Sequence, residues 1–281
     1  MKVNTFEFDY SKQKEFKFFF SSDHHMMSDD FDNDRFQYEF NFAKQQGCYF
    51  INGGDWGEFI TVRDKRYRKS RDICKTEGQI NETIDEAVDK FTPYADRILI
   101  QSSGNHEMTI LANNAIDPTS MLIRDLNRIG NRIDNPIKHG SYSGFILFRF
   151  YWNEPGNASI RYTVYYNHGM GGSPEVSKGT IDAERRKYID ADLIWTQHIH
   201  KKLNGYNDAK IGIDRNGNYY EREQKFLISG AYKKNVNLEE EGVVKNIYSE
   251  QRCRTTQAKG GSILTIEIEN STTIHSRIEM L

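Results

Sequence analysis

The sequence lacks most of the features that mark secreted, membrane-spanning or low-complexity proteins. Cysteine occurs only three times in 281 residues. Because Cys48, Cys74 and Cys253 lie far apart and form no CxxC pair, we expect free thiols in a reducing compartment. Proline (5) and glycine (21) are too scarce for collagen-like or low-complexity sequence. The sequence contains no apolar run of about 18 residues and no signal-peptide pattern, so we expect a cytoplasmic protein without a membrane partner.

An excess of one charge is also missing. The 38 Lys and Arg nearly balance the 40 Asp and Glu, for a net charge of −2. This excludes a general polycation, so any contact with nucleic acid must come from a local basic patch. Aromatic residues make up 13% of the chain and can supply a large buried area. We expect a single domain over residues 1–281, because the candidate site residues described below span most of the chain.

Apolar runs and helical patterns alternate in the first half of the chain. Short apolar runs predict strands over residues 16–22, 48–52 and 97–101, and amphipathic patterns predict helices over residues 31–46, 81–91 and 119–129. Such alternation favours parallel strand pairing and an α/β fold. The second half is richer in hairpins, with strands expected over residues 144–152, 160–166, 193–196, 210–213, 219–220, 225–229 and 263–268. Residues 182–189 could form a helix, and residues 235–256 are interpreted as a loop.

Residue types that bind metals follow five of the predicted strands. The segments are Asp23-His24-His25, Gly54-Asp55, Gly104-Asn105-His106-Glu107, Asn167-His168 and His198-Ile199-His200. Sites in open α/β sheets form beyond the carboxyl ends of strands, so these segments can meet at one edge. Each segment alone is a weak signal, since a single His is more often structural and Asn is also a common helix cap.

The two-residue period of an extended chain adds detail to two of these segments. His198 and His200 can face one ion, because residues two apart point to the same side. By the same rule, His24 points away from Asp23 and His25, and we expect its side chain to be packed in the interior.

The five segments, taken in order, resemble the calcineurin-like metallophosphoesterases. That family shows Asp-x-His, Gly-Asp-x-x-Asp/Arg, Gly-Asn-His-Asp/Glu, a single His and Gly-His-x-His. The resemblance implies an α/β fold, a four-layer αββα sandwich of two mixed sheets flanked by helices. Two positions depart from the pattern: Gln197 replaces the Gly before His198, and Glu58 stands where the family has Asp or Arg. The second departure disfavours a dedicated Ser/Thr phosphatase.

The resemblance also implies two divalent metal ions that share Asp55. One ion would be bound by Asp23, His25, Asp55 and His200, and the other by Asp55, Asn105, His168 and His198. Imidazole and oxygen ligands together suit Mn²⁺, which we expect, or Fe, Zn or Ni, rather than Ca²⁺ or Mg²⁺. Two such ions can clamp the attacking and leaving oxygens and supply a metal-bound hydroxide as nucleophile.

The same resemblance assigns catalytic roles to two residues that are not ligands. His106 would stabilise charge on the phosphoryl group or protonate the leaving oxygen. Glu107 would orient His106 or support the ligands from behind. The alternative for Glu107 is that it merely solvates the start of a helix.

A basic segment follows the Asp55 motif and bears on the substrate. Residues 63–71 contain six basic residues and one acid. Arg66 and Arg68 could contact a phosphate backbone, as could Lys201 beside His200, although an ordinary solvated face explains the segment equally well. We therefore expect a phosphodiesterase or nuclease acting on DNA or RNA. The alternatives are a phosphomonoesterase or nucleotidase for a small phosphorylated metabolite, and a non-catalytic metal-binding scaffold.

Overall fold

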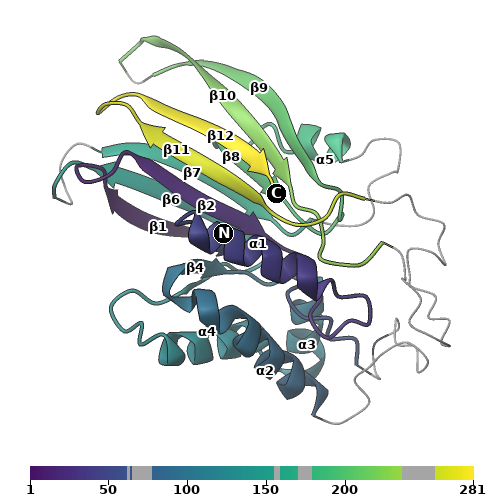
Figure 1. Ribbon diagram of the computed structural model, residues 1–281. Helices are drawn as coiled ribbons and strands as arrows, with labels where there is room; N and C mark the ends of the chain where they lie inside the picture. Colours follow the sequence, from purple (N-terminus) through teal and green to yellow (C-terminus); the bar gives the residue numbers. More distant parts are fainter. Residues whose placement is uncertain (62–63, 65–77, 155–158, 170–178, 215, 236–256) are drawn as a thin grey trace.

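Two mixed β-sheets packed face to face form the centre of the molecule, as seen in a computed structural model (Figure 1). The structure describes residues 1–61, 64, 78–154, 159–169, 179–214, 216–235 and 257–281. The expected α/β class is confirmed in this form, with two mixed sheets and few helices. Within the described residues, no helix is both long enough and apolar enough to cross a membrane.

The first sheet, called sheet 1, has the strand order β12-β11-β2-β3-β4-β5. Its strands are β2 (Glu15–Ser21), β3 (Tyr49–Asn52), β4 (Ile98–Gln101), β5 (Lys138–His139), β11 (Ser262–Ile268) and β12 (Ile274–Met280). The four strands from β2 to β5 run parallel, whereas β11 is antiparallel to both β2 and β12. The carboxyl ends of β2, β3 and β4 therefore lie at one edge.

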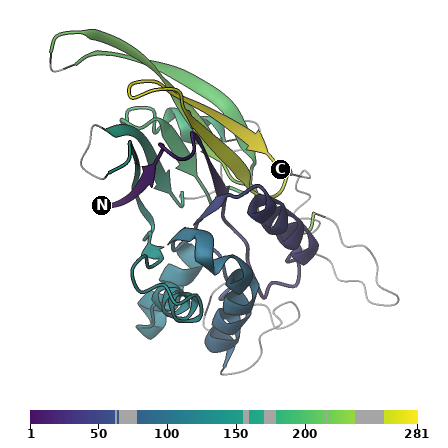
Figure 2. The ribbon, with the colours of Figure 1, turned by 60° about the vertical axis from the view of Figure 1, so that its left-hand side comes forward.

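The second sheet, called sheet 2, has the order β1-β6-β7-β8-β10-β9. Its strands are β1 (Lys2–Asp9), β6 (Ser143–Tyr151), β7 (Ser159–Asn167), β8 (Leu193–Thr196), β9 (Leu203–Ile213) and β10 (Tyr219–Ile228). The neighbours β7, β8 and β10 are parallel, so their carboxyl ends also share an edge. The β9–β10 hairpin extends well beyond the other strands (Figure 2).

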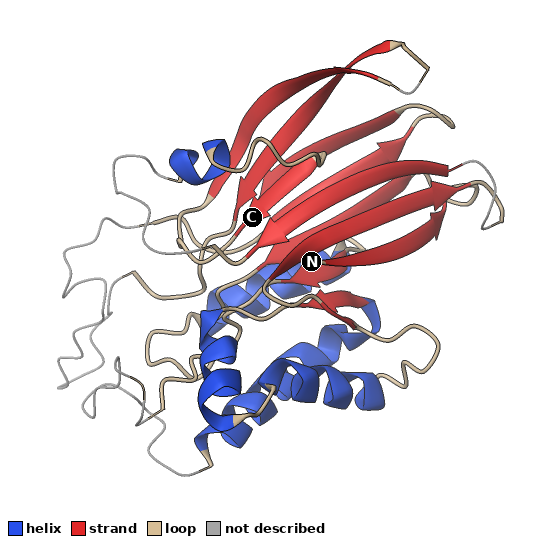
Figure 3. Cartoon of the chain, turned by 180° about the vertical axis from the view of Figure 1, so that it is seen from behind, coloured by secondary structure: helices blue, strands red, loops and turns tan. Residues whose placement is uncertain are grey.

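Helices cover the outer sides of the two sheets unequally (Figure 3). The helices are α1 (Asn33–Gln45), α2 (Gln79–Phe91), α3 (Asn105–Asn114), α4 (Pro118–Ile129) and the short α5 (Thr180–Glu184), with a 3₁₀ turn η1 at Thr92–Arg97. Helices α1, α2 and α4 share a hydrophobic cluster with sheet 1, and α5 packs on sheet 2.

Strand β2 shows how the sequence builds this layering. Its successive phenylalanines point to opposite faces. Phe19 packs among the helices, while Phe18 and Phe20 pack between the two sheets. All three are fully buried. An uninterrupted apolar run is therefore what a strand covered on both faces requires.

Most of the expected elements are present, with differences at both ends of the chain and around residues 180–189. The predicted strand over residues 16–22 and helix over residues 31–46 match β2 and α1 closely. The helix predicted over residues 182–189 instead spans Thr180–Glu184, and strands β1 and β12 were not predicted. Residues 236–256 of the predicted loop lie outside the described residues.

Candidate metal centre

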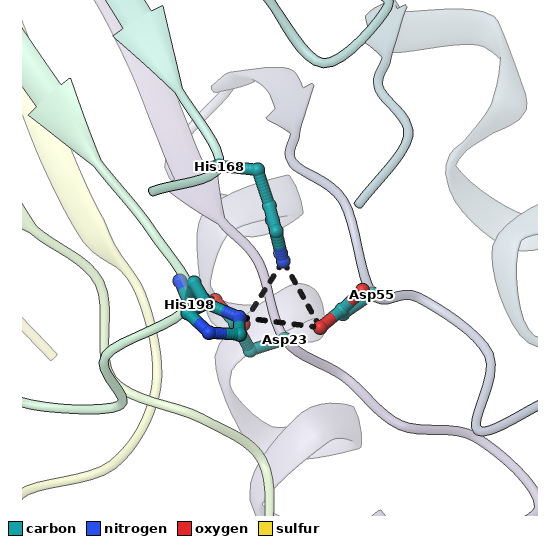
Figure 4. A group of neighbouring side chains, drawn as sticks. All are labelled: Asp23, Asp55, His168 and His198. Carbon is teal, nitrogen blue, oxygen red and sulfur yellow. Dashed lines mark hydrogen bonds and ion pairs between the residues drawn. The ribbon is translucent and has the colours of Figure 1, made fainter. Parts of the chain in front are cut away.

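The expected ligands converge where the carboxyl-end edges of the two sheets face each other. Asp23 and His25 follow β2, Asp55 follows β3, and Asn105 begins α3 after β4. From sheet 2, His168 follows β7, while His198 and His200 follow β8. The side chains of Asp23, Asp55, His168 and His198 point toward one another from these separate loops (Figure 4).

The loops that carry the ligands have an unusual backbone. Five of the expected ligands have positive φ values: Asp23 (55°), His25 (52°), Asp55 (55°), His198 (74°) and His200 (54°). Residues other than glycine rarely adopt this backbone conformation. It costs on the order of 1–3 kcal/mol per residue, and such residues cluster at functional sites. Hydrogen bonds between the loops hold them in place: Asp23 N–H donates to Gly54 O (2.9 Å) and His25 N–H to Asp55 O (3.0 Å).

One group of side chains contains Asp23, Asp55, His168 and His198, whose ligand atoms all lie within 4.8 Å of one another. His168 Nε2 is 3.0 Å from Asp55 Oδ2 and 3.2 Å from Asn105 Oδ1. Two atoms that each bind an ion at about 2.1 Å are separated by roughly 3.0–3.4 Å. His198 Nδ1 is buried and makes no hydrogen bond with the described residues. Both observations fit a metal site.

A second group contains Asp23, His25 and His200. The Nε2 atoms of His25 and His200 are 3.2 Å apart, and His200 Nε2 is 3.4 Å from Asp23 Oδ1. Two imidazole nitrogens that face each other at this distance are well suited to share a cation. Asp23 belongs to both groups, whereas the resemblance implied that it binds one ion only. Asp55 also forms a third group with His25 and His106.

Charge at the centre favours a cation. Burial opposes ionisation of Asp55, but the nearby His168 and His106 hold its pKa well below the usual range. Burial also acts against protonation of His168, yet Asp55 raises its pKa to about 9. His25 has the opposite behaviour, since burial lowers its pKa to about 4. A metal ion must therefore displace a proton from His168, and binding should release protons.

A buried ion-pair network supports His25 from behind. Glu58 Oε2 lies 2.7 Å from His25 Nδ1 and 3.3 Å from Lys233 Nζ, and Lys233 also pairs with Asp30 at 3.1 Å. A carboxylate at Nδ1 fixes the imidazole so that Nε2 faces the centre. Glu58, which stands where the family pattern has Asp or Arg, therefore supplies a carboxylate that supports His25. Sequence reasoning missed Lys233, which follows β10 without any recognisable motif.

His106 and Glu107 both lie beside Asp55 but contact different parts of it. His106 N–H donates to Asp55 Oδ1 (2.9 Å), its Nδ1 contacts the carbonyl of Glu58, and its Nε2 is 3.9 Å from Asp55 Oδ2. The buried Glu107 carboxylate accepts from the N–H groups of Gly104 (2.6 Å), Asp55 (2.9 Å) and Gly57 (3.2 Å). Glu107 thus supports the Asp55 loop and is not a solvated helix start. Burial raises its pKa to about 8.

The remaining expectations concern His24 and the basic residues. The packing of His24 is confirmed, since it is fully buried, stacks on Tyr232 and lies 3.1 Å from Ser21 Oγ. Arg66 and Arg68 lie outside the described residues. Lys201 is 9% exposed directly after His200. The next residue, Lys202, donates to the carbonyls of Lys259 and Leu281.

Comparisons with known proteins assign no family. No family model matches the sequence, and no curated protein matches it. Among solved structures, the chain is similar to GAP50, described as the anchor in the inner membrane complex of Plasmodium. The alignment covers 96% of this chain and 90% of the other, with 8% identity and a TM-score of 0.44. This likeness is too slight to assign a fold family or a function.

Proposed function

We propose that the protein is a dinuclear metal-dependent phosphoester hydrolase of the calcineurin-like metallophosphoesterase type. One observation carries the proposal: two groups of His and Asp side chains that share Asp23 meet where the two sheets end, and Asp55 connects the first group to His25 of the second through a third group. The donor set is imidazole and carboxylate, which suits Mn²⁺, Fe, Zn or Ni. The four-layer sandwich of that family is part of the same proposal and agrees with two stacked sheets that carry helices outside.

The roles of the protein groups follow from their positions. Two bound divalent ions would activate water and neutralise charge on the phosphoryl group. The ions would be held by Asp23, Asp55, Asn105, His25, His168, His198 and His200. Glu58 orients His25, and Glu107 supports the Asp55 loop. In His106, Nδ1 is occupied by the Glu58 carbonyl, so Nε2 is the atom that faces the centre. That atom can deliver a proton to the leaving oxygen or stabilise charge there.

The proposed substrate is a phosphodiester, most simply in a nucleic acid. Support comes from the sequence, in which the basic residues 63–71 follow the Asp55 motif. Arg side chains suit phosphate backbones. A phosphomonoesterase remains the alternative within the same chemistry, and a non-catalytic scaffold is the alternative outside it. The presence of His106 at the centre speaks against the scaffold, because a site that only binds metal needs no such group.

Hydrolysis assays separate these alternatives. We expect protein reconstituted with Mn²⁺ to cleave bis(p-nitrophenyl) phosphate faster than p-nitrophenyl phosphate, and to cut an oligonucleotide. Faster turnover of the monoester, without any cleavage of the oligonucleotide, would exclude the nuclease function and favour the phosphomonoesterase. Two bound ions without turnover of any ester would favour the non-catalytic scaffold.

A binding assay tests the basic segment. Replacing Arg66 and Arg68 by Gln should weaken oligonucleotide binding and make its affinity less dependent on salt concentration. An unchanged salt dependence would show that residues 63–71 form an ordinary solvated surface.

A further inference from the structure

Gln197 occupies the position at which the family pattern has glycine, and its side chain is inserted into the metal centre. It follows β8 directly and is only 1% exposed. The glycine is not needed for backbone reasons, because Gln197 does not have a positive φ, unlike His198 and His200 after it. The position can therefore carry a side chain, and the question is what that side chain does.

The orientation of the Gln197 amide follows from its neighbours. Its Oε1 accepts a hydrogen bond from Gly54 N–H at 2.9 Å. A backbone N–H can only donate, so the oxygen and not the nitrogen of the amide must face it. The same oxygen lies 3.2 Å from His168 Nδ1. An oxygen that accepts there requires the proton of His168 to be on Nδ1, which leaves the Nε2 lone pair for an ion.

The turn after β3 is shaped to admit this amide. A Cβ atom on Gly53 would lie 2.4 Å from Gln197 Oε1 and 2.5 Å from Ser22 Cβ. Such contacts are impossible, so the close approach of Gln197 requires glycine at position 53. The side chain thus joins the end of β3 in sheet 1 to His168 and β8 in sheet 2.

We propose that Gln197 is a positioning residue that fixes His168 with its proton on Nδ1 and its Nε2 directed at the metal centre. The inference rests on the proposed function only in that the centre holds metal. It goes beyond the family pattern, whose glycine at this position has no side chain to offer. Gln197 does not contact the reacting atoms and acts only through His168 and the Gly53-Gly54 turn.

Three variants test the proposal with Mn²⁺ affinity as the readout, measured by isothermal titration. Gln197→Leu removes the acceptor, and we expect it to weaken binding of one ion by about 10–100-fold, as is typical when a supporting hydrogen bond to a ligand is lost. Gln197→Glu keeps the acceptor, and its affinity should stay near the wild-type value. Gln224→Leu is the control, because Gln224 is equally buried but donates to the Ile189 and Ala191 carbonyls away from the centre. Its Mn²⁺ affinity should not change.

A second readout does not depend on whether a variant folds. In wild-type protein loaded with Zn²⁺, ¹⁵N NMR of the histidine rings should show His168 with a proton on Nδ1. Unchanged affinity in Gln197→Leu, equal losses in Gln197→Leu and Gln197→Glu, or a proton on Nε2 would each overturn the proposal. Two bound ions without ester hydrolysis would count against the proposed function alone. Wild-type protein that binds no Mn²⁺ would overturn both.

Discussion

Replacement of Asp55 by Asn tests whether one carboxylate serves both ions. The substitution conserves shape, and its Oδ1 can still accept from His106 N–H, which is 2.9 Å away in the wild type. It removes the negative charge that lies 3.0 Å from His168 Nε2 and 3.9 Å from His198 Nδ1. Because Asp55 also belongs to the group with His25 and His106, both ions should be lost together.

The size of the effect can be estimated from the length of the chain. A ligand present at 100 times its Kd stabilises the folded state by about 2.7 kcal/mol. The unfolding entropy of a 281-residue chain is about 0.6 kcal/mol per kelvin. Each ion should then raise Tm by about 4–5 °C, and two ions by about 9 °C. In Asp55→Asn the shift should fall close to zero.

The assay is thermal unfolding with and without saturating Mn²⁺, combined with metal analysis. The shift within each variant is compared, since loss of the Asp55–His168 ion pair also alters the metal-free protein. Asp117→Asn is the matched control, because Asp117 caps α4 and Asn is also a good cap. Its shift should equal that of the wild type. If Asp55→Asn keeps two ions, or half of the shift, then Asp55 is not shared and the reasoning fails.

Three further predictions concern single residues. His106→Ala should lower turnover by roughly 10²–10⁴-fold with little change in metal content by elemental analysis; loss of metal would make His106 a ligand. Burial lowers the pKa of His24 from 6.5 to about 3, so its contribution to stability is complete above pH 6.5 and lost as the pH falls toward 3. His24→Gln should therefore reduce the slope of unfolding free energy against pH by about 1.4 kcal/mol per unit between those values, and an unchanged slope would contradict a buried neutral imidazole. Burial raises the pKa of the Cys48 thiol to about 12, so peptide mapping should find it unlabelled by iodoacetamide at pH 8 until the protein is denatured.

The sequence predicts elements well where the apolar pattern is strong and both faces are covered. The apolar run that forms β2 and the spaced aromatic residues of α1 locate those elements within one or two residues. The edge strands β1 and β12 have weaker signals because one side of each is open to solvent or lacks a partner strand. Their pairing depends on β6 and β11, and only the folded chain shows those contacts.

The residues of the candidate site could be predicted from the sequence, but the contacts between them could not. Positions after strand ends indicate Asp23, Asp55 and His168 from sequence alone, because parallel strands end at a common edge. The proximity of Asp23 to both groups depends on how the two sheets stack, which no local pattern encodes. The contact between Lys233 and Glu58 joins residues 175 positions apart and has no motif.

The candidate ligands follow strands of both sheets, and this has a mechanical consequence. Asp23 and Asp55 follow strands of sheet 1, while His168 and His198 follow strands of sheet 2. A cation bound between them would cross-link the two sheets and resist sliding of one sheet against the other. Binding of the ion would then also stiffen the contact between the two sheets, including the aromatic side chains packed between them.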